Sequence, residues 1–426
     1  MGVSSNPLNV AIIGAGIGGL ALAIGLLRQN VPYTLYEAAA EYSTIGAGVG
    51  LGPNALRAMD MIDPRFRALY EDISSGNLTP NKNHVMMDAL LIEEGFGKNQ
   101  GIDPASYGAD CYDRTSCHRK ALLDIMTGLI PLSTVRFNKR LKSLVQEKDK
   151  VIITFEDGEV TEANSVIGCD GVKGATRPVV LGEKYPDQVA ATYSGKYAYR
   201  SIIPMKDAIE IIGEHAGDAK MFMGPGVNMT TFPISKGTAC NAVVFKLDDK
   251  PWSYQDWTRP VDPEVMFGDF STGVDKRLVK LLEWGKPLQW SIWHHLDTPV
   301  YYNGLICLLG DSAHATTPHQ AAGAGQCLED ALILSRLLGK VTCITQVKPA
   351  YQIYDSIRRP RAQRVVRTSQ ETGLIYAFRH PDFGTDMRKI VEHLNERFLW
   401  LWEHDLQSDV VKAEAEFAKI IDQTSV

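Results

Sequence analysis

The segment GDSAHATTPHQAAGAG, residues 310–325, brings an acid, a hydroxyl and an imidazole close together in the sequence. Asp311, Ser312 and His314 are the residue types of a hydrolase, in which a histidine removes the proton of a nucleophilic serine. A serine and a histidine two positions apart rarely meet in this way, and the segment has no G-x-S-x-G turn. It is otherwise rich in glycine and alanine. This composition favours a loop whose bare backbone lies flat against a planar ligand.

Other residues give no sign of a metal site or a disulfide framework. His314 and His319 lack a carboxylate or a third histidine at a workable spacing. The seven cysteines are scattered, odd in number and without a C-x-x-C pair, which indicates a reducing compartment. The N-terminus lacks the pattern of a signal peptide, and no apolar stretch is long enough to cross a bilayer. We therefore expect a cytoplasmic protein with no bound metal and no transmembrane segment.

The clearest motif lies near the N-terminus, where an apolar run leads into Gly14, Gly16 and Gly19 in G-x-G-x-x-G spacing. An apolar helix and a second strand ending at Glu37 follow. The helix N-terminus would bind a pyrophosphate, because its free N–H groups and its dipole favour an anion. Glu37 is placed to accept hydrogen bonds from both hydroxyls of an adenosine ribose. The tightly held nucleotide is therefore FAD or NAD(H) rather than NADP(H).

The chain does not continue as a simple dehydrogenase would. A second glycine-rich passage, with Gly46, Gly48, Gly50 and Gly52, leads into a helix at Pro53, and residues 76–112 are irregular. Later segments supply further strands. One of these ends at Cys169-Asp170-Gly171 and another ends at Gly310-Asp311. Because an α/β sheet binds its ligand at strand ends, these segments predict a nucleotide domain assembled from separated pieces.

The charge pattern argues against a nucleic-acid partner. The formal net charge is −6, and the only dense basic run, Arg358 to Arg367, lies in a helix-like stretch flanked by acids. Such a run is typical of a solvated or salt-bridged helix face. The composition, 45% hydrophobic and 22% charged, is that of a globular protein large enough for two or three domains.

The glycine motif with Glu37, the CDG at 169–171 and the GDSAHATTP at 310–318 occur in the order found in the FAD-dependent aromatic hydroxylases, the group A flavoprotein monooxygenases. The chain resembles most their salicylate hydroxylase-like branch, which has many fungal members. The resemblance implies an α/β fold with a Rossmann-like FAD-binding domain, an inserted β-sheet substrate domain and a C-terminal helical region. The expected ranges are 1–75, 105–185 and 285–345 for the FAD-binding domain, 76–104 and 186–284 for the substrate-binding domain, and 346–426 for the helical region.

The resemblance also implies which residues hold FAD. Glu37 would bind the adenosine ribose, Arg119 the ribityl or phosphate portion, and Asp311 the ribityl chain or pyrophosphate. The backbone around Gly50 would approach the cofactor, and Asp170 closes a strand at the same site.

The loop from Pro318 to Gly325 would lie along the isoalloxazine ring. Backbone N–H groups near Gly323 and Ala324 would face its pyrimidine end. The following helix N-terminus would stabilise the negative charge of reduced flavin. The chain departs from its relatives at Ala321, where they commonly have glycine, and a positive φ there would make the methyl group costly.

The substrate pocket would be formed by the middle domain. By resemblance, Arg200 points at the substrate, where its guanidinium could bind a phenolate or a carboxylate. Phe232 replaces a hydrogen-bonding tyrosine found in some relatives, and Pro318 completes the pocket. A group before the third motif either lines the cavity or is simply buried: Trp290, Trp293, His294 and His295.

The implied activity is that of a monooxygenase with tightly but non-covalently bound FAD, transient NADPH or NADH, and O2 as co-substrate. One oxygen atom would pass from a flavin C4a-hydroperoxide to a phenolic, salicylate-like substrate, and Arg200 would assist by stabilising a phenolate. An alternative is tailoring of a polyketide or indole by dearomatising hydroxylation or epoxidation. A remote alternative is a non-catalytic binding protein with a flavin-binding fold. The protein would be a monomer or homodimer, with Trp400 and Trp402 in a dimer contact or a lid.

Overall fold

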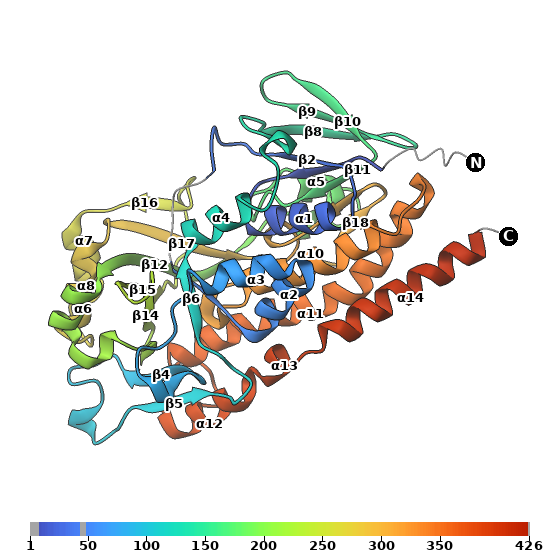
Figure 1. Ribbon diagram of the computed structural model, residues 1–426. Helices are drawn as coiled ribbons and strands as arrows, with labels where there is room; N and C mark the ends of the chain where they lie inside the picture. The colour runs from blue at the N-terminus through green and yellow to red at the C-terminus, as the bar shows by residue number, and fades with distance from the viewer. Residues whose placement is uncertain (1–7, 43–47, 425–426) are drawn as a thin grey trace.

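The computed structural model describes residues 8–42 and 48–424 of the 426-residue chain (Figure 1). Its first layer is a six-stranded sheet in which five strands run parallel and one edge strand runs antiparallel. In spatial order the strands are β18 (Tyr302–Asn303), β19 (Ile306–Leu308), β11 (Ser165–Gly168), β1 (Val10–Ile13), β2 (Tyr33–Tyr36) and β7 (Val135–Arg136). The sheet thus joins segments that are far apart in the sequence, as the separated strand ends predicted.

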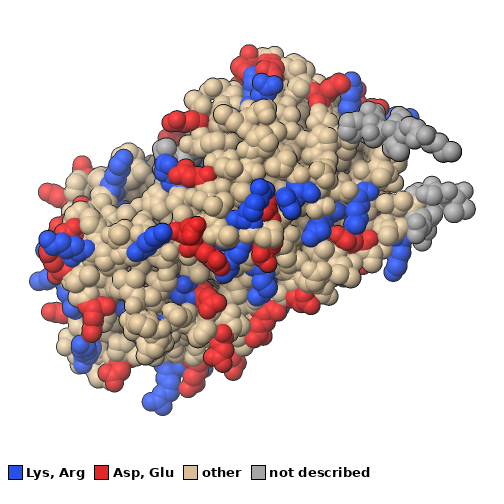
Figure 2. Space-filling model, viewed as in Figure 1, with Lys and Arg blue, Asp and Glu red and all other residues tan. Residues whose placement is uncertain are grey.

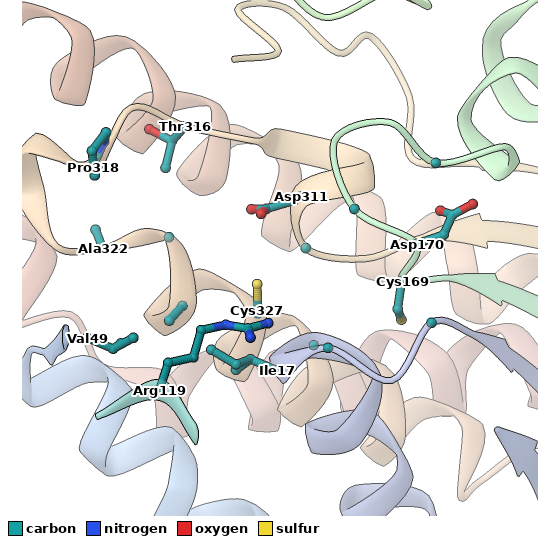
Figure 3. Close-up of a pocket in the computed structure, with 18 of the residues that line it drawn as sticks. Ile17, Val49, Arg119, Cys169, Asp170, Asp311, Thr316, Pro318, Ala322 and Cys327 are labelled. Atoms are coloured by element: carbon teal, nitrogen blue, oxygen red, sulfur yellow. The ribbon is translucent and has the colours of Figure 1, made fainter. Parts of the chain in front are cut away.

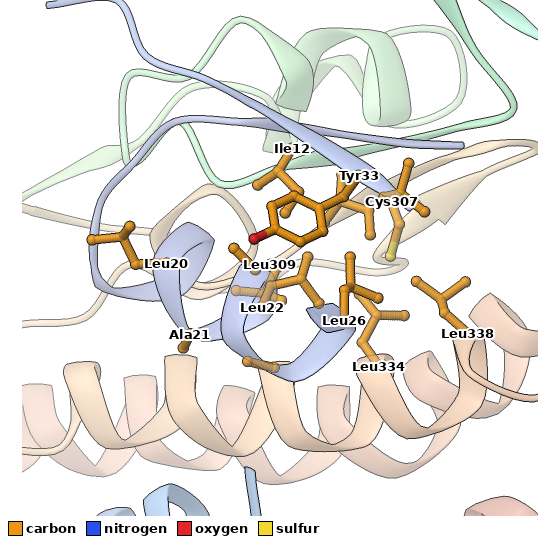
Figure 4. Packing of buried hydrophobic residues seen from close by; sticks show 14 of the residues in the cluster. Ile12, Leu20, Ala21, Leu22, Leu26, Tyr33, Cys307, Leu309, Leu334 and Leu338 are labelled. Atoms are coloured by element: carbon orange, nitrogen blue, oxygen red, sulfur yellow. The ribbon is translucent and has the colours of Figure 1, made fainter. Parts of the chain in front are cut away.

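The largest hydrophobic core lies between this sheet and two helices, α1 (Ile17–Arg28) and α10 (Gly323–Leu338). Figure 4 shows α1 between the strands and α10, with Leu22 and Leu26 directed into the shared core. A three-stranded sheet also contributes to this core and contacts β2, where the rings of Phe155 and Tyr36 are 4.8 Å apart. Its strands are β8 (Leu141–Gln146), β9 (Val151–Phe155) and β10 (Val160–Ala163).

Shorter elements surround the strand ends. The strands β3 (Gly48–Leu51) and β6 (Thr115–His118) pair as an antiparallel ladder. The remaining helices of this part are α2 (Pro53–Ile62), α3 (Pro64–Glu71), α4 (Arg119–Thr127), α5 (Thr176–Leu181) and α9 (Asp311–His314). The helices α4 and α9 thus begin at residues predicted to bind the cofactor.

The second large layer is an eight-stranded, mostly antiparallel sheet. In order it contains β16 (Thr258–Pro260), β17 (Leu288–His294), β12 (Thr192–Pro204), β15 (Ala239–Leu247), β14 (Val227–Ile234), β13 (Lys220–Gly224), β4 (Val85–Leu91) and β5 (Ala105–Gly108). One face packs on α6 (Met205–Ile212), α7 (Pro263–Gly268) and α8 (Lys276–Leu281). Alternate residues such as Val243 and Phe245 point to the other face, where a cavity lies.

The C-terminal part is helical, with α11 (Val347–Tyr376), α12 (Met387–Arg397), α13 (Leu399–Trp402) and α14 (Leu406–Thr424). In Figure 1, α12 lies beside β5, and α14 runs along α11 toward the C-terminus. Trp402 is 2% exposed, and its ring lies 4.4 Å from that of Tyr112. The prediction of a lid or a dimer contact is therefore wrong for Trp402, which belongs to the core.

The predicted fold class is confirmed, with an inserted sheet and a helical C-terminal region. Strands β5 and β17 belong to the eight-stranded sheet although they lie outside the ranges 76–104 and 186–284. The division into domains stays a proposal. The ends of its outer ranges, 1–7 and 425–426, and the segment 43–47 lie outside the described residues.

Charges of both signs cover the face of the molecule seen in Figure 2. No helix among the described residues is long and apolar enough to cross a bilayer.

Candidate cofactor and substrate site

A cavity of about 780 Å³ runs from the ends of the parallel strands to the inner face of the eight-stranded sheet. It is lined by segments from the N-terminal glycine loop, the β3 ladder, the loop after β11 and the residues around α9 and α10 (Figure 3). The predicted residues that line it are Gly14, Gly16, Glu37, Gly50, Arg119, Asp170, Arg200, Phe232, Asp311, Pro318, Gly323 and Ala324. The structure thus brings together residues from five separated regions of the chain, 14–50, 119, 170, 200–232 and 311–324.

The N-terminal glycine loop opens the cavity at the start of α1. Gly14 has a φ of +103° and donates its N–H to the Tyr36 carbonyl at 2.7 Å. A Cβ on Gly16 would have no atom within 4 Å, so a ligand can approach the backbone there. No side chain caps α1, which leaves its first N–H groups available to a phosphate.

Gly19, the third glycine of the motif, does not line the cavity. A Cβ at this position would lie 1.9 Å from the Gly14 carbonyl oxygen. Its lack of a side chain therefore lets α1 pack against the turn that follows β1. This matches the packing role of the third motif glycine and does not make Gly19 a direct contact of the cofactor.

Glu37 is held firmly at the end of β2. Its two carboxylate oxygens accept backbone N–H bonds from Ala15 and Ala39, each at 2.8 Å. A carboxylate oxygen has a second lone pair, so each can still accept a ribose hydroxyl. The geometry fits the predicted ribose contact.

Opposite charges face each other across the middle of the cavity. Arg119 and Asp311 extend toward the same space from α4 and α9 (Figure 3). Burial lowers the pKa of Arg119, while the charges of Asp311 and Glu37 oppose this shift. Burial also raises the pKa of Asp311, and His314 and Arg119 oppose that change. The pair suits a ligand with both hydroxyl and phosphate groups at this point.

Asp170 lines the cavity, but both of its oxygens already have partners. The Thr176 N–H donates to Oδ2 at 2.9 Å and the Thr176 hydroxyl to Oδ1 at 2.5 Å. Burial raises the pKa of Asp170, and the bonds from Thr176 counter this effect. The carboxylate therefore fixes the loop before α5. Direct contact with the cofactor stays a prediction.

The third motif provides a flat backbone surface ending in a helix N-terminus. A 3-10 turn, η7 (Pro318–Gln320), leads to the start of α10 at Gly323, where no side chain caps the helix. Gly323 and Ala324 line the cavity, and contact of their N–H groups with the pyrimidine end of a flavin stays a prediction.

Ala321 has a φ of +50° and a ψ of +34°, the left-handed conformation that favours glycine. We expect Ala321→Gly to stabilise the protein by about 1 kcal/mol, because a non-glycine residue pays roughly this cost there. Denaturant unfolding of the cofactor-free protein measures the effect. An unchanged or lower midpoint would show that packing of the Ala321 methyl group outweighs the strain.

Ser312 and His314 do not form a nucleophile and base. The Ser312 hydroxyl donates to the carbonyl oxygens of Gly168 and Leu309, at 2.5 and 2.9 Å. The His314 Nε2 atom lies 2.5 Å from Asp330 Oδ2. Both side chains are fully enclosed, so they shape the loop rather than react. Among the described residues, no group of three or more histidine, cysteine or acidic side chains could hold a metal ion.

A buried ion network behind this loop was missed by the sequence analysis. Asp330 accepts bonds from the Gly310 N–H at 3.1 Å and from Arg358 Nε at 2.9 Å. Glu329 accepts from Arg358 Nη1 at 2.6 Å and from Arg361 Nε at 2.7 Å. The arginine run was predicted to be a solvated or salt-bridged helix face. Arg358 and Arg361 are salt-bridged to Glu329, but at 0% and 8% exposed they are buried rather than solvated.

The end of the cavity at the eight-stranded sheet has apolar walls and cationic side chains. Arg200 comes from β12, and its guanidinium carbon lies 4.9 Å from the Trp290 ring centroid. Phe232, Val243 and Phe245 provide apolar walls. Four residues were predicted either to line the cavity or to be simply buried. None of them lines the cavity: Trp290, Trp293, His294 and His295.

FAD fits this arrangement. An open glycine loop at an uncapped helix, the Glu37 carboxylate and a bare backbone beside a second uncapped helix all line one cavity. When bound, FAD supplies a ring that accepts hydride from NAD(P)H and activates O2. The side chains that line the cavity would then bind and orient the cofactor.

Comparison with known proteins supports this interpretation. A family model described as an FAD binding domain matches residues 7–369. An FAD-dependent monooxygenase of Gibberella moniliformis is 40% identical over 97% of both chains. The 6-methylsalicylate 1-monooxygenase of Aspergillus terreus is 38% identical over 99% of this chain and 95% of its own. A salicylate hydroxylase of Pseudomonas putida is 35% identical over 97% of this chain and 95% of its own.

A solved salicylate hydroxylase in complex with its substrate superimposes with a TM-score of 0.84, at 29% identity, and covers 96% of this chain and 98% of that one. The fold and the cavity therefore define an FAD-binding flavoprotein. The chain belongs to the FAD-dependent monooxygenases, as an aromatic hydroxylase similar to the salicylate hydroxylases. The resemblance found in the sequence and the predicted cofactor are thus confirmed.

Proposed function

We propose that the enzyme inserts one oxygen atom from O2 into a salicylate-like phenol, with NADPH or NADH as the transient reductant. The observation that carries this proposal is the placement of Arg200 in an apolar cavity end next to the Pro318–Ala324 loop. Relatives named for salicylate and 6-methylsalicylate support the substrate class.

The roles that we propose for the protein groups are binding and electrostatic. Arg200 binds an anionic oxygen of the substrate, because a guanidinium offers paired donors to a phenolate or carboxylate. A phenolate has more electron-rich ortho and para carbons than a phenol. Phe232 and its apolar neighbours keep water from the reacting ring. The N-terminus of α10 favours negative charge beside Gly323.

The first experiment is an absorption spectrum of the purified protein, followed by NADH and NADPH consumption with salicylate, 6-methylsalicylate and simple phenols. We expect flavin bands, faster reductant use with a phenolic acid, and a product that carries one atom from ¹⁸O2. Reductant use that yields only hydrogen peroxide with every phenolic acid would contradict the proposed substrate class.

The variant Arg200→Met tests the role of Arg200. We expect kcat/KM for the phenolic acid to fall by about 10- to 100-fold, the value of one or two hydrogen bonds to a charged group. Steady-state kinetics measure the loss, and FAD content provides the control for folding. Unchanged kcat/KM with full FAD content would remove Arg200 from the substrate site.

The proposed setting is the cytoplasm, and the proposed assembly is a monomer or homodimer. The seven free cysteines support a reducing compartment. Light scattering after gel filtration distinguishes the two assemblies, and a larger particle would contradict both.

A further inference from the structure

Three buried nitrogen donors without partners lie together at the substrate end of the cavity. They are Nε and Nη2 of Arg114 and Nδ2 of Asn241, none of which has a hydrogen-bond partner among the described residues. The two side chains are 4% and 1% exposed, and both line the cavity. Neither was singled out by the sequence motifs.

Phe232 connects the two groups in space. The Arg114 guanidinium carbon lies 5.0 Å from the centroid of the Phe232 ring. A Cβ on Gly48 would lie 2.6 Å from Phe232 Cε2 and 2.8 Å from Asn241 Cγ. Arg114 and Asn241 therefore flank one aromatic wall, although they come from the segment before β6 and from β15.

The orientation of the Asn241 amide is fixed by the hydrogen bond that its oxygen accepts. Its Oδ1 accepts the Gly48 N–H at 2.8 Å. Since that N–H can only donate, the partner atom must be the amide oxygen, and Nδ2 remains as a free donor. Arg114 is held less tightly, by a 3.5 Å contact between Nη1 and the Tyr112 hydroxyl.

Burying a guanidinium without a hydrogen-bond acceptor destabilises the protein. A ligand that supplies an acceptor reduces this cost. The donor set here contains only N–H groups, so it calls for an oxygen acceptor with negative charge. A planar guanidinium binds a carboxylate through two parallel hydrogen bonds, and a neighbouring amide NH2 can add a third.

We propose that Arg114 and Asn241 bind the carboxylate of the substrate and make the enzyme specific for phenolic acids over neutral phenols. This inference rests on the proposed function. It assigns the carboxylate to Arg114 and leaves Arg200 for the phenolic oxygen. Arg114 is then a residue that determines substrate specificity.

The test compares salicylate with its neutral amide, salicylamide, by titrating each into the FAD-containing enzyme and following the flavin absorption. We expect Arg114→Gln to raise the Kd of salicylate by about 10- to 100-fold, the range for hydrogen bonds to a charged group. The Kd of salicylamide should change by less than about 3-fold, because no charged pair is lost with this ligand.

A second variant separates the loss of a substrate contact from misfolding of Arg114→Gln. Asn241→Asp keeps an oxygen that can accept the Gly48 N–H but replaces the Nδ2 donor with a negative oxygen. It is expected to show the same selective loss of salicylate. Arg67→Gln makes the same chemical change as Arg114→Gln in a residue that pairs with Glu71 on α3, and should leave both Kd values unchanged.

The outcomes separate this inference from the proposed function. Equal weakening of salicylate and salicylamide in Arg114→Gln would overturn the inference, as would loss of FAD with the preference for the acid intact. A wild-type enzyme that binds another phenolic acid but not salicylate would change the proposed substrate, and the same acid and amide comparison would still test Arg114. A wild-type enzyme that responds only to neutral phenols would overturn both proposals.

Discussion

The variant Glu329→Gln is expected to destabilise the protein by about 3–5 kcal/mol, the usual cost of removing one partner from a buried ion pair. Glu329 is fully buried and accepts hydrogen bonds from Arg358, Arg361 and the Asn54 amide, the last at 2.6 Å. Glutamine fills nearly the same volume, so the effect combines the lost charge with one acceptor replaced by an NH2 donor that faces other donors. Denaturant unfolding of the cofactor-free protein gives the measurement.

The effect of Glu329→Gln depends on pH in a defined direction. Burial alone would raise the pKa of Glu329, but the charges of Arg358 and Arg361 outweigh it and hold that pKa far below the ordinary value of 4.5. The stabilisation is therefore complete above about pH 4.5 and is lost as the pH falls toward the lowered pKa. The stability difference between wild type and variant should stay constant near neutral pH and shrink in acid.

A surface pair provides the matched control for Glu329→Gln. Lys120 and Asp124 form an exposed ion pair at 2.7 Å on α4. Asp124→Asn should cost less than about 1 kcal/mol, because such pairs are solvated and screened. An equal loss for Asp124→Asn and Glu329→Gln would contradict the special role of the buried network.

The variant Gly19→Ala is expected to lose at least about 3 kcal/mol of stability and most of its affinity for FAD, because overpacking against backbone lies at the severe end of its range. The new Cβ would lie 1.9 Å from the Gly14 carbonyl oxygen and 3.3 Å from Cys169 Cβ. Alanine favours a helix over glycine by only about 1 kcal/mol, which cannot offset this clash. Denaturant unfolding and FAD titration of the cofactor-free protein measure the two losses.

Gly16→Ala is the matched control, three positions earlier in the same motif. Its Cβ meets no atom within 4 Å, and Gly16 has an ordinary φ of −75°. The cofactor-free protein should keep its stability, and only FAD binding should weaken, since Gly16 faces the cavity. Similar losses of stability in both variants would mean that the two glycines do not differ as described.

The glycine motif and Glu37 were predictable because each role depends on residues close in sequence. A strand, a tight turn and a helix fix the spacing, and the carboxylate follows at the end of the next strand. The loop at Asp311 was likewise recognisable from its composition and order. Gly14, Gly16, Glu37 and Asp311 all line the cavity, whereas Gly19 packs against the turn after β1.

The buried network and the Arg114 group could not be predicted in the same way. Arg358 looks like one of several arginines on a polar helix, and only the packing of α11 against α10 places it beside Glu329 and Asp330. The conformation of Ala321 was left open for a similar reason, since φ depends on how η7 joins α10. Tertiary contacts decide such cases, and a local pattern contains no signal for them.

The order of strands in the six-stranded sheet has a consequence for biosynthesis. The central strand β1 pairs with β11, whose first residue is Ser165, and the cavity is completed only by residues around Gly323. A growing chain on the ribosome therefore carries an open strand edge and an unfinished nucleotide site for most of its synthesis. The whole flavin site exists only once these distant segments have come together. A ligand that binds only the folded form therefore stabilises the fold as a whole, with a gain that rises with its concentration.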